Sequence, residues 1–108
     1  MSEMAVLVIR VGAQQTEDYE RLFAESELPR WRDYQERGLF KSARIFRSAF
    51  GTHEKDGIAN YVIVVETDDD GHHVHDNDPA FKEFNRQADA LQPEEPFVFG
   101  GEPIFSVG

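Results

Sequence analysis

Two segments of the chain are almost wholly apolar and rich in β-branched residues, and they constrain the fold more than any other feature. Met4–Val11 is MAVLVIRV and Ala59–Thr67 is ANYVIVVET. Successive side chains of a strand point to opposite faces of its sheet, and in both segments both sets are apolar. Strands of this kind are buried on both faces, so these two are predicted to lie in the centre of a sheet.

Two further segments have the character of edge strands. Leu39–Phe50 (LFKSARIFRSAF) places one lysine and two arginines among its apolar residues. Phe97–Val107 (FVFGGEPIFSV) is interrupted by two glycines and a proline, which favours an edge strand with a bulge. The polar segment Gly51–Gly57 ends in Asp-Gly and predicts a hairpin loop between the second and third strands.

Helical patterns fill the remaining intervals. The first has Thr16 as its candidate N-cap. A kink or break is expected near Glu27–Pro29, because proline in a helix interior lacks the amide hydrogen, and another short helix follows that Gly38 closes. The second begins with Asp78 as N-cap and Pro79 at the first helical position.

The resulting order, β-α-β-β-α-β, predicts a single α+β domain over residues 1–108 with a ferredoxin-like fold and a four-stranded antiparallel sheet. In this topology the first and third strands are central, which agrees with the apolar pattern. Two helices cover only one face of the sheet, and an exposed apolar second face is unusual for a soluble monomer. We therefore predict a homodimer formed face to face through the sheets, as a dimeric α/β barrel.

Charge and composition exclude several classes of function. The net charge of −10 disfavours binding to nucleic acid or to an anionic membrane surface. Cysteine is absent, which excludes thiolate chemistry. The apolar runs are shorter than the ~20 residues that span a bilayer, and the first residues are predicted to form a strand, not a signal peptide. The expected location is the cytoplasm.

The chain resembles the dimeric α/β-barrel superfamily of ferredoxin-like domains, without matching one subfamily. The resemblance rests on MAVLVIRV, on the helical region with ELPRWRDYQERG, on IANYVIVVETDD and on DPAFKEFNRQADAL. It implies a pocket between sheet and helices. Members include cofactor-free monooxygenases, haem-degrading enzymes and small isomerases. The first strand lacks the asparagine on which the monooxygenase and haem-degrading members rely, so no catalytic residue is carried over.

The segment His72-His73-Val74-His75 is the strongest local chemical signal, and it is predicted to be a loop between the third strand and the second helix. Imidazoles beside carboxylates suit a transition metal, although the spacing matches no strong metal motif. A single histidine acting as acid or base is the alternative, and His75 beside Asp76 is the candidate. A solvated surface loop explains the same residues without function.

Five other residues are candidates for a site. Arg44 and Arg47 could hold an anionic group, but they alternate in direction, so only one faces the pocket of a regular strand. Asn60 and Tyr61, at the start of the third strand, could supply polar groups, and Trp31 could line the pocket mouth. Each also has an ordinary structural explanation in the core, at the sheet edge or in solvent.

Three hypotheses on function follow. The first is an enzyme without a cofactor, a monooxygenase or isomerase that binds a small aromatic or polyketide-like compound and uses His75, Asn60 or Arg44 as catalytic residue, with Trp31, Tyr61 or Arg47 binding the substrate. The second is a module that binds a small ligand or assembles without turnover. The third is a metal-binding protein that uses the His72–His75 segment. The sequence leaves open whether the protein is an enzyme.

Overall fold

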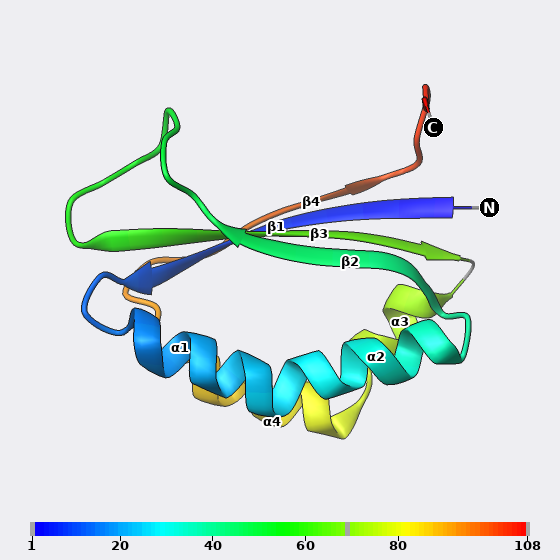
Figure 1. Ribbon diagram of the computed structural model, residues 1–108, viewed down its shortest axis with the longest axis horizontal. Coiled ribbons are helices and arrows are strands. Elements are labelled where there is room, and N and C mark those ends of the chain that lie inside the picture. Colours follow the sequence, from blue (N-terminus) through cyan, green and yellow to red (C-terminus); the bar gives the residue numbers. More distant parts are fainter. Residues whose placement is uncertain (1, 69, 108) are drawn as a thin grey trace.

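A computed structural model describes residues 2–68 and 70–107 and confirms the predicted β-α-β-β-α-β order, with one additional short helix. The strands are β1 (Ser2–Gly12), β2 (Phe40–Arg47), β3 (Ile58–Asp68) and β4 (Phe97–Gly101). The helices are α1 (Thr16–Leu22), a π-helical turn (Phe23–Glu27), α2 (Leu28–Glu36), α3 (Gly71–Asp76) and α4 (Pro79–Asp89). The antiparallel sheet has the order β2-β3-β1-β4, so the two apolar strands are central and the other two form the edges. Figure 1 shows all helices on one face of this sheet.

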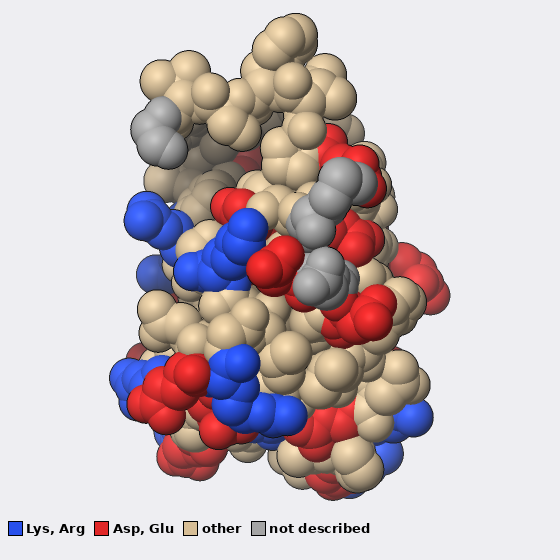
Figure 2. Space-filling model, turned by 90° about the vertical axis from the view of Figure 1, so that its right-hand side faces the viewer, with Lys and Arg blue, Asp and Glu red and all other residues tan. Residues whose placement is uncertain are grey.

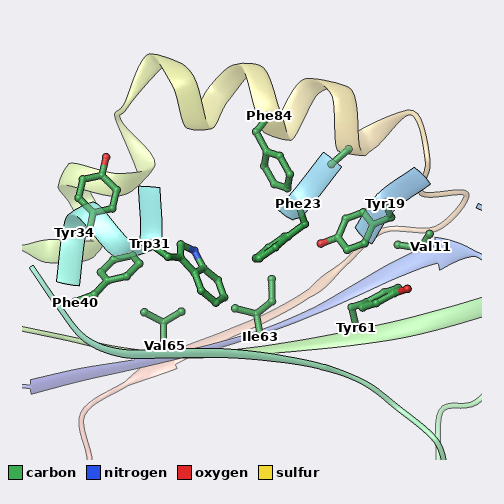
Figure 3. Close-up of a cluster of buried hydrophobic side chains, with 11 residues drawn as sticks. Val11, Tyr19, Phe23, Trp31, Tyr34, Phe40, Tyr61, Ile63, Val65 and Phe84 are labelled. Atoms are coloured by element: carbon green, nitrogen blue, oxygen red, sulfur yellow. The ribbon is translucent and has the colours of Figure 1, made fainter. Parts of the chain in front are cut away.

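The core lies between the helices and the sheet. Phe23 and Trp31 extend from the helical layer toward Ile63 and Val65 of β3 (Figure 3), and the rings of Phe23 and Trp31 meet edge to face at 5.0 Å between centroids. Phe84 of α4 packs on Phe23 from the other side, 5.8 Å away. Such aromatic contacts add about 0.5–1.5 kcal/mol per pair beyond burial of their area. They fix the two helices over the central strands.

Local sequence signals set most helix ends. Gly38 has φ +76° after α2, and the amides of Gly38 and Leu39 donate to the carbonyls of Gln35 and Tyr34. This pattern is a Schellman motif, and it confirms the predicted helix end. At the start of α4, the Asp78 carboxylate accepts from the Ala80 amide at 2.8 Å, which confirms the predicted N-cap. At the start of α1, by contrast, Gln15 and not Thr16 is the N-cap.

The irregularity expected near Glu27–Pro29 is a π-helical turn, and the helix continues through it. The Leu28 amide donates to the Phe23 carbonyl, five residues back, and Pro29 follows within the first turn of α2. Because Pro29 has no amide hydrogen, a regular ladder cannot pass through this point. The wider turn keeps the chain helical there and turns Glu27 toward the core, where it is 2% exposed.

Three details of the predicted elements are wrong. The histidine segment is not a loop but the helix α3. Its first residue packs so closely on the residue before β2 that only glycine fits, because an added Cβ at Gly71 would lie 2.1 Å from the Leu39 carbonyl oxygen. The last strand ends at Gly101, since the proline at position 103 cannot donate to a ladder, and not at Val107. The bulge lies in β2, between Phe40 and Ser42.

The face of the sheet opposite the helices is open (Figure 1). The register places the alternate residues of the central strands there, with Val6 opposite Val64 and Val8 opposite Val62. Phe46 and Phe99 on the edge strands are 55% and 63% exposed. Both central strands therefore carry apolar side chains on both faces, as predicted. The second face is open around these valines, whereas Arg10 and Asn60 at one end of it are buried.

Candidate functional site

A cavity of about 260 Å³ lies between the sheet and the helices. Its walls are mostly apolar and come from β1, β3, β4, the π-helical turn and α2–α4, including Leu7, Ile9, Phe23, Trp31, Phe84 and Val98. A cavity of roughly 150 Å³ lined by apolar side chains holds a benzene ring. The volume of this cavity suits a compound with a single aromatic ring or with two fused rings.

Two ionisable side chains meet in the wall of this cavity. The Glu27 carboxylate, from the π-helical turn, lies 2.8 Å from Nε2 of His75 in α3. Nδ1 of the same imidazole lies 3.1 Å from the Asp76 carboxylate. The Arg30 guanidinium reaches Glu27 from the next helical turn at 3.3 Å. A carboxylate on each ring nitrogen favours the doubly protonated imidazolium, which donates to both.

Aromatic rings surround the imidazole and fix its plane. Phe81 lies 4.2 Å from it between centroids, Phe40 5.4 Å and Tyr34 5.6 Å. The Tyr34 hydroxyl donates to Asp78, the N-cap of α4, and burial together with this bond raises the pKa of Tyr34 to about 12. Burial alone lowers the pKa of His75, but the hydrogen bonds and charges of Glu27 and Asp76 outweigh it and raise this pKa above its ordinary value.

This pKa shift predicts a pH-dependent stability. Because the folded-state pKa of His75 lies above the unfolded value of about 6.5, its stabilising contribution is complete below pH about 6.5 and is lost as pH rises through the folded-state pKa. We expect the free energy of unfolding from urea titrations to fall as pH rises from 6 to 9. In a His75→Gln variant the fall should be smaller, and an equal fall in both proteins would contradict the assignment.

The other histidines of α3 do not join this pair. His72 lies 3.2 Å from the Glu3 carboxylate at the beginning of β1, and His73 is exposed. In a helix, positions 73 and 75 lie on nearly opposite sides, so the shared direction expected for an extended loop is lost. Among the described residues, no group of three histidine or carboxylate side chains is arranged to hold a metal ion.

The remaining predicted residues separate into two sets. Trp31 lines the cavity. Tyr61 and Arg47 lie outside it in a shallow groove beside α1, where the Glu20 carboxylate accepts from the Tyr61 hydroxyl at 2.5 Å and pairs with Arg47 at 3.4 Å. Burial, followed by the bond to Glu20, raises the pKa of Tyr61 to about 12.

Arg44 and Asn60 lie on the open face of the sheet and do not line the cavity. Arg44 is opposite Val64 in the register, and Asn60 is opposite Arg10. Phe40 lies four positions before Arg44, which would place both on one face of a regular strand, but the bulge in β2 reverses the alternation and turns Phe40 toward the helices. Catalytic roles for Arg44 and Asn60 remain predictions without support from this geometry.

Sequence reasoning missed Glu27 and Thr67, which both line the cavity and are both 2% exposed. A signal for Glu27 was present. It lies four residues after Phe23 and four before Trp31, so an acidic residue occupies the apolar stripe of the first helical region. Thr67, the last residue of the predicted third strand, carried no comparable signal.

Comparison with known proteins supports the fold. No family model matches the sequence, and no curated protein sequence matches it. Among solved structures, Rv0793 from Mycobacterium tuberculosis is similar, with a TM-score of 0.77, 13% identity and full coverage of both chains. A candidate antibiotic biosynthesis monooxygenase from Nitrosomonas europaea has a TM-score of 0.75 and 9% identity, over 99% of this chain and 94% of that one.

A third similar structure is that of SnoaB, a cofactor-independent oxygenase from Streptomyces nogalater. Its TM-score is 0.70 at 17% identity, over 98% of this chain and 96% of that one. Identities this low establish the fold alone. No helix among the described residues is long and apolar enough to cross a membrane. The chain has the ferredoxin-like fold of the antibiotic biosynthesis monooxygenase domain proteins, as its resemblance to the dimeric α/β-barrel superfamily predicted.

Proposed function

We propose that the protein is a small enzyme that binds an aromatic compound in the cavity and moves a proton through the Glu27–His75 pair, as a monooxygenase or isomerase without a dedicated cofactor. The observation that carries the proposal is the buried carboxylate–imidazole contact of 2.8 Å in the wall of a mostly apolar cavity. Similarity to a cofactor-independent oxygenase agrees with it at the level of fold.

Both reaction types share a first step that these residues suit. An enolisable or phenolic ring compound becomes reactive toward oxygen, or rearranges, once a proton leaves its C–H or O–H group. Glu27 is the proton acceptor in this proposal. The neighbouring His75 and Arg30 stabilise its charge before transfer, and His75 orients it.

Hydrogen exchange tests the proposal with a bicyclic ketone. In D₂O, the parent protein should accelerate deuterium uptake next to the carbonyl of 2-tetralone, measured by NMR. General-base catalysis typically contributes ~10²–10⁴-fold, so Glu27→Gln should lose most of the acceleration. Quenching of Trp31, the one tryptophan in the chain, measures binding in the same samples. Oxygen uptake measured in parallel with phenolic compounds separates a monooxygenase from an isomerase.

Glu83→Gln is the matched control, because it removes one carboxylate from the exposed side of α4 without touching the cavity. The Glu83→Gln protein should accelerate deuterium uptake by 2-tetralone as much as the parent protein does. Binding of 2-tetralone without accelerated exchange would overturn the enzyme proposal in favour of a binding module. Equal exchange by the parent and Glu27→Gln would remove Glu27 from the chemistry.

We also propose that two copies pair through the open faces of their sheets. Support comes from the exposed Phe46 and Phe99 beside the central valines on that face. Light scattering should give twice the chain mass of 12.4 kDa. A Val62→Lys/Val64→Lys variant should shift to the monomer mass, while Lys82→Glu, an exposed change on α4, should not. A monomeric parent protein would overturn the dimer.

A further inference from the structure

The lining of the cavity contains acidic side chains but no lysine or arginine among the described residues. Three carboxylates belong to the lining, those of Glu3, Glu27 and Asp76. The nearest guanidinium that contacts this group, Arg30, already pairs with Glu27. An anion entering the cavity therefore meets no lysine or arginine of the lining, and the nearby cations His75 and Arg30 are already paired with carboxylates of the protein.

His75 is not available to bind a ligand anion. Its two ring nitrogens lie 2.8 Å from Glu27 and 3.1 Å from Asp76, so both N–H groups are engaged by carboxylates within the protein. His72 at the end of the cavity faces the Glu3 carboxylate at 3.2 Å. Each imidazole therefore already has a protein carboxylate close to a ring nitrogen, at 2.8 Å for His75 and 3.2 Å for His72.

The lining instead offers hydrogen-bond acceptors. Oγ1 of Thr67, a hydroxyl that can accept or donate, and Oε1 of Gln92, which can only accept, are buried and have no hydrogen-bond partner among the described residues. Thr67 is 2% exposed, and the Gln92 amide nitrogen donates to the Ala88 carbonyl, which leaves the amide oxygen unpaired. A buried acceptor without a donor destabilises the empty site, so a ligand that brings a donor satisfies it.

The end of the molecule that holds α3 is acidic as well. Glu3 and Glu66 lie near this end of the central strands, Asp70 is the N-cap of α3, and Asp76 is its last residue. In the space-filling view of this end, acidic side chains cluster on one part of the surface and basic side chains lie beside them (Figure 2). Their field disfavours approach of an anion by the same route.

From these features we infer that the cavity selects neutral aromatic compounds that carry a hydrogen-bond donor, such as a hydroxyl group, and rejects aromatic carboxylates. Thr67 and Glu3 determine this specificity: Thr67 accepts from the hydroxyl group, and Glu3 repels the carboxylate. The inference rests on the proposed function only in using the same cavity, and it requires no turnover.

Calorimetric titration with three probes of one shape tests it. 2-Naphthol should bind at least about tenfold more tightly than 2-naphthoate at pH 7.5, since one uncompensated charge at close range is worth this much or more. 2-Methoxynaphthalene, which lacks the donor, should bind less tightly than 2-naphthol. Thr67→Val, similar in shape, should remove the preference for 2-naphthol over 2-methoxynaphthalene. Glu3→Gln should reduce the difference in affinity between 2-naphthol and 2-naphthoate. Glu83→Gln should leave this difference unchanged.

The outcomes separate the two proposals. Binding of 2-naphthoate as tight as that of 2-naphthol would overturn the inference and leave the cavity as a ligand site. An unchanged preference in Thr67→Val, with a native circular dichroism spectrum, would overturn the role of Thr67. Failure of all three probes to bind would overturn both the inference and the proposed function.

Discussion

Replacing Gly71 with alanine is expected to destabilise the protein by about 3 kcal/mol, at the upper end of what overpacking a core causes. The added Cβ would lie 2.1 Å from the carbonyl oxygen of Leu39 and 3.1 Å from Cβ of Thr67. Neither neighbour is the end of a flexible side chain. The first turn of α3 must therefore move away from the sheet, and His75 moves with it.

Urea denaturation measures the loss of stability, and binding of 2-tetralone should weaken in the same variant. Gly101→Ala is the matched control, since a Cβ there has no described atom within 4 Å. It should keep the parental stability. A Gly71→Ala protein as stable as the parent would show that the close approach of α3 to Leu39 is not a constraint on the fold.

The second large effect is expected from Glu27→Ala, which removes the acidic partner that His75 and Arg30 share. Removing one partner of a buried ion pair typically destabilises by about 3–5 kcal/mol, because the opposite charge stays buried without compensation. The loss should be greatest below pH about 6.5, where the imidazole is charged in both the folded and the unfolded chain.

A double variant distinguishes an unpaired charge from a packing defect. Glu27→Leu/His75→Phe replaces both partners with apolar side chains, and such replacements are often neutral or stabilising. We expect urea titration to show most of the lost stability restored, with deuterium exchange still absent. If the double variant is as unstable as Glu27→Ala, the shape of the pair and not its charge holds α3 in place.

The fold was predictable because several independent patterns in the chain agree. The apolar strands, the capping residues Gly38 and Asp78 and the breakers in the last strand all indicate one topology. The histidine segment was misassigned because its polar composition is typical of loops. Its helix depends on a contact with Leu39, thirty-two positions earlier, which no local pattern reveals.

The candidate site was predictable only in part, for a similar reason. His75 was identified by its chemistry and its place before a helix start, but its main partner, Glu27, lies forty-eight residues earlier. Strict alternation along β2 also fails at the bulge between Phe40 and Ser42, which places Phe40 on the opposite face from the one its spacing predicts. The periodic spacing of apolar residues reveals helices and strands, but it contains no information on long-range contacts or on single-residue insertions such as a bulge.

The π-helical turn has a consequence for how such a site can arise or disappear. Tyr19 and Trp31 lie twelve positions apart, about 3.3 turns of a regular helix, yet both side chains are buried in one core because the wider turn absorbs one residue. Loss of the codon for Glu27 would remove the extra residue of the wide turn and place Ser26 at this position, and the apolar residues of the two flanking helices would keep their common face. One in-frame deletion could thus remove the carboxylate and keep the apolar side chains in register, although His75 and Arg30 would lose their shared partner. Chains with closely similar backbones can therefore differ in whether they carry the chemistry at all.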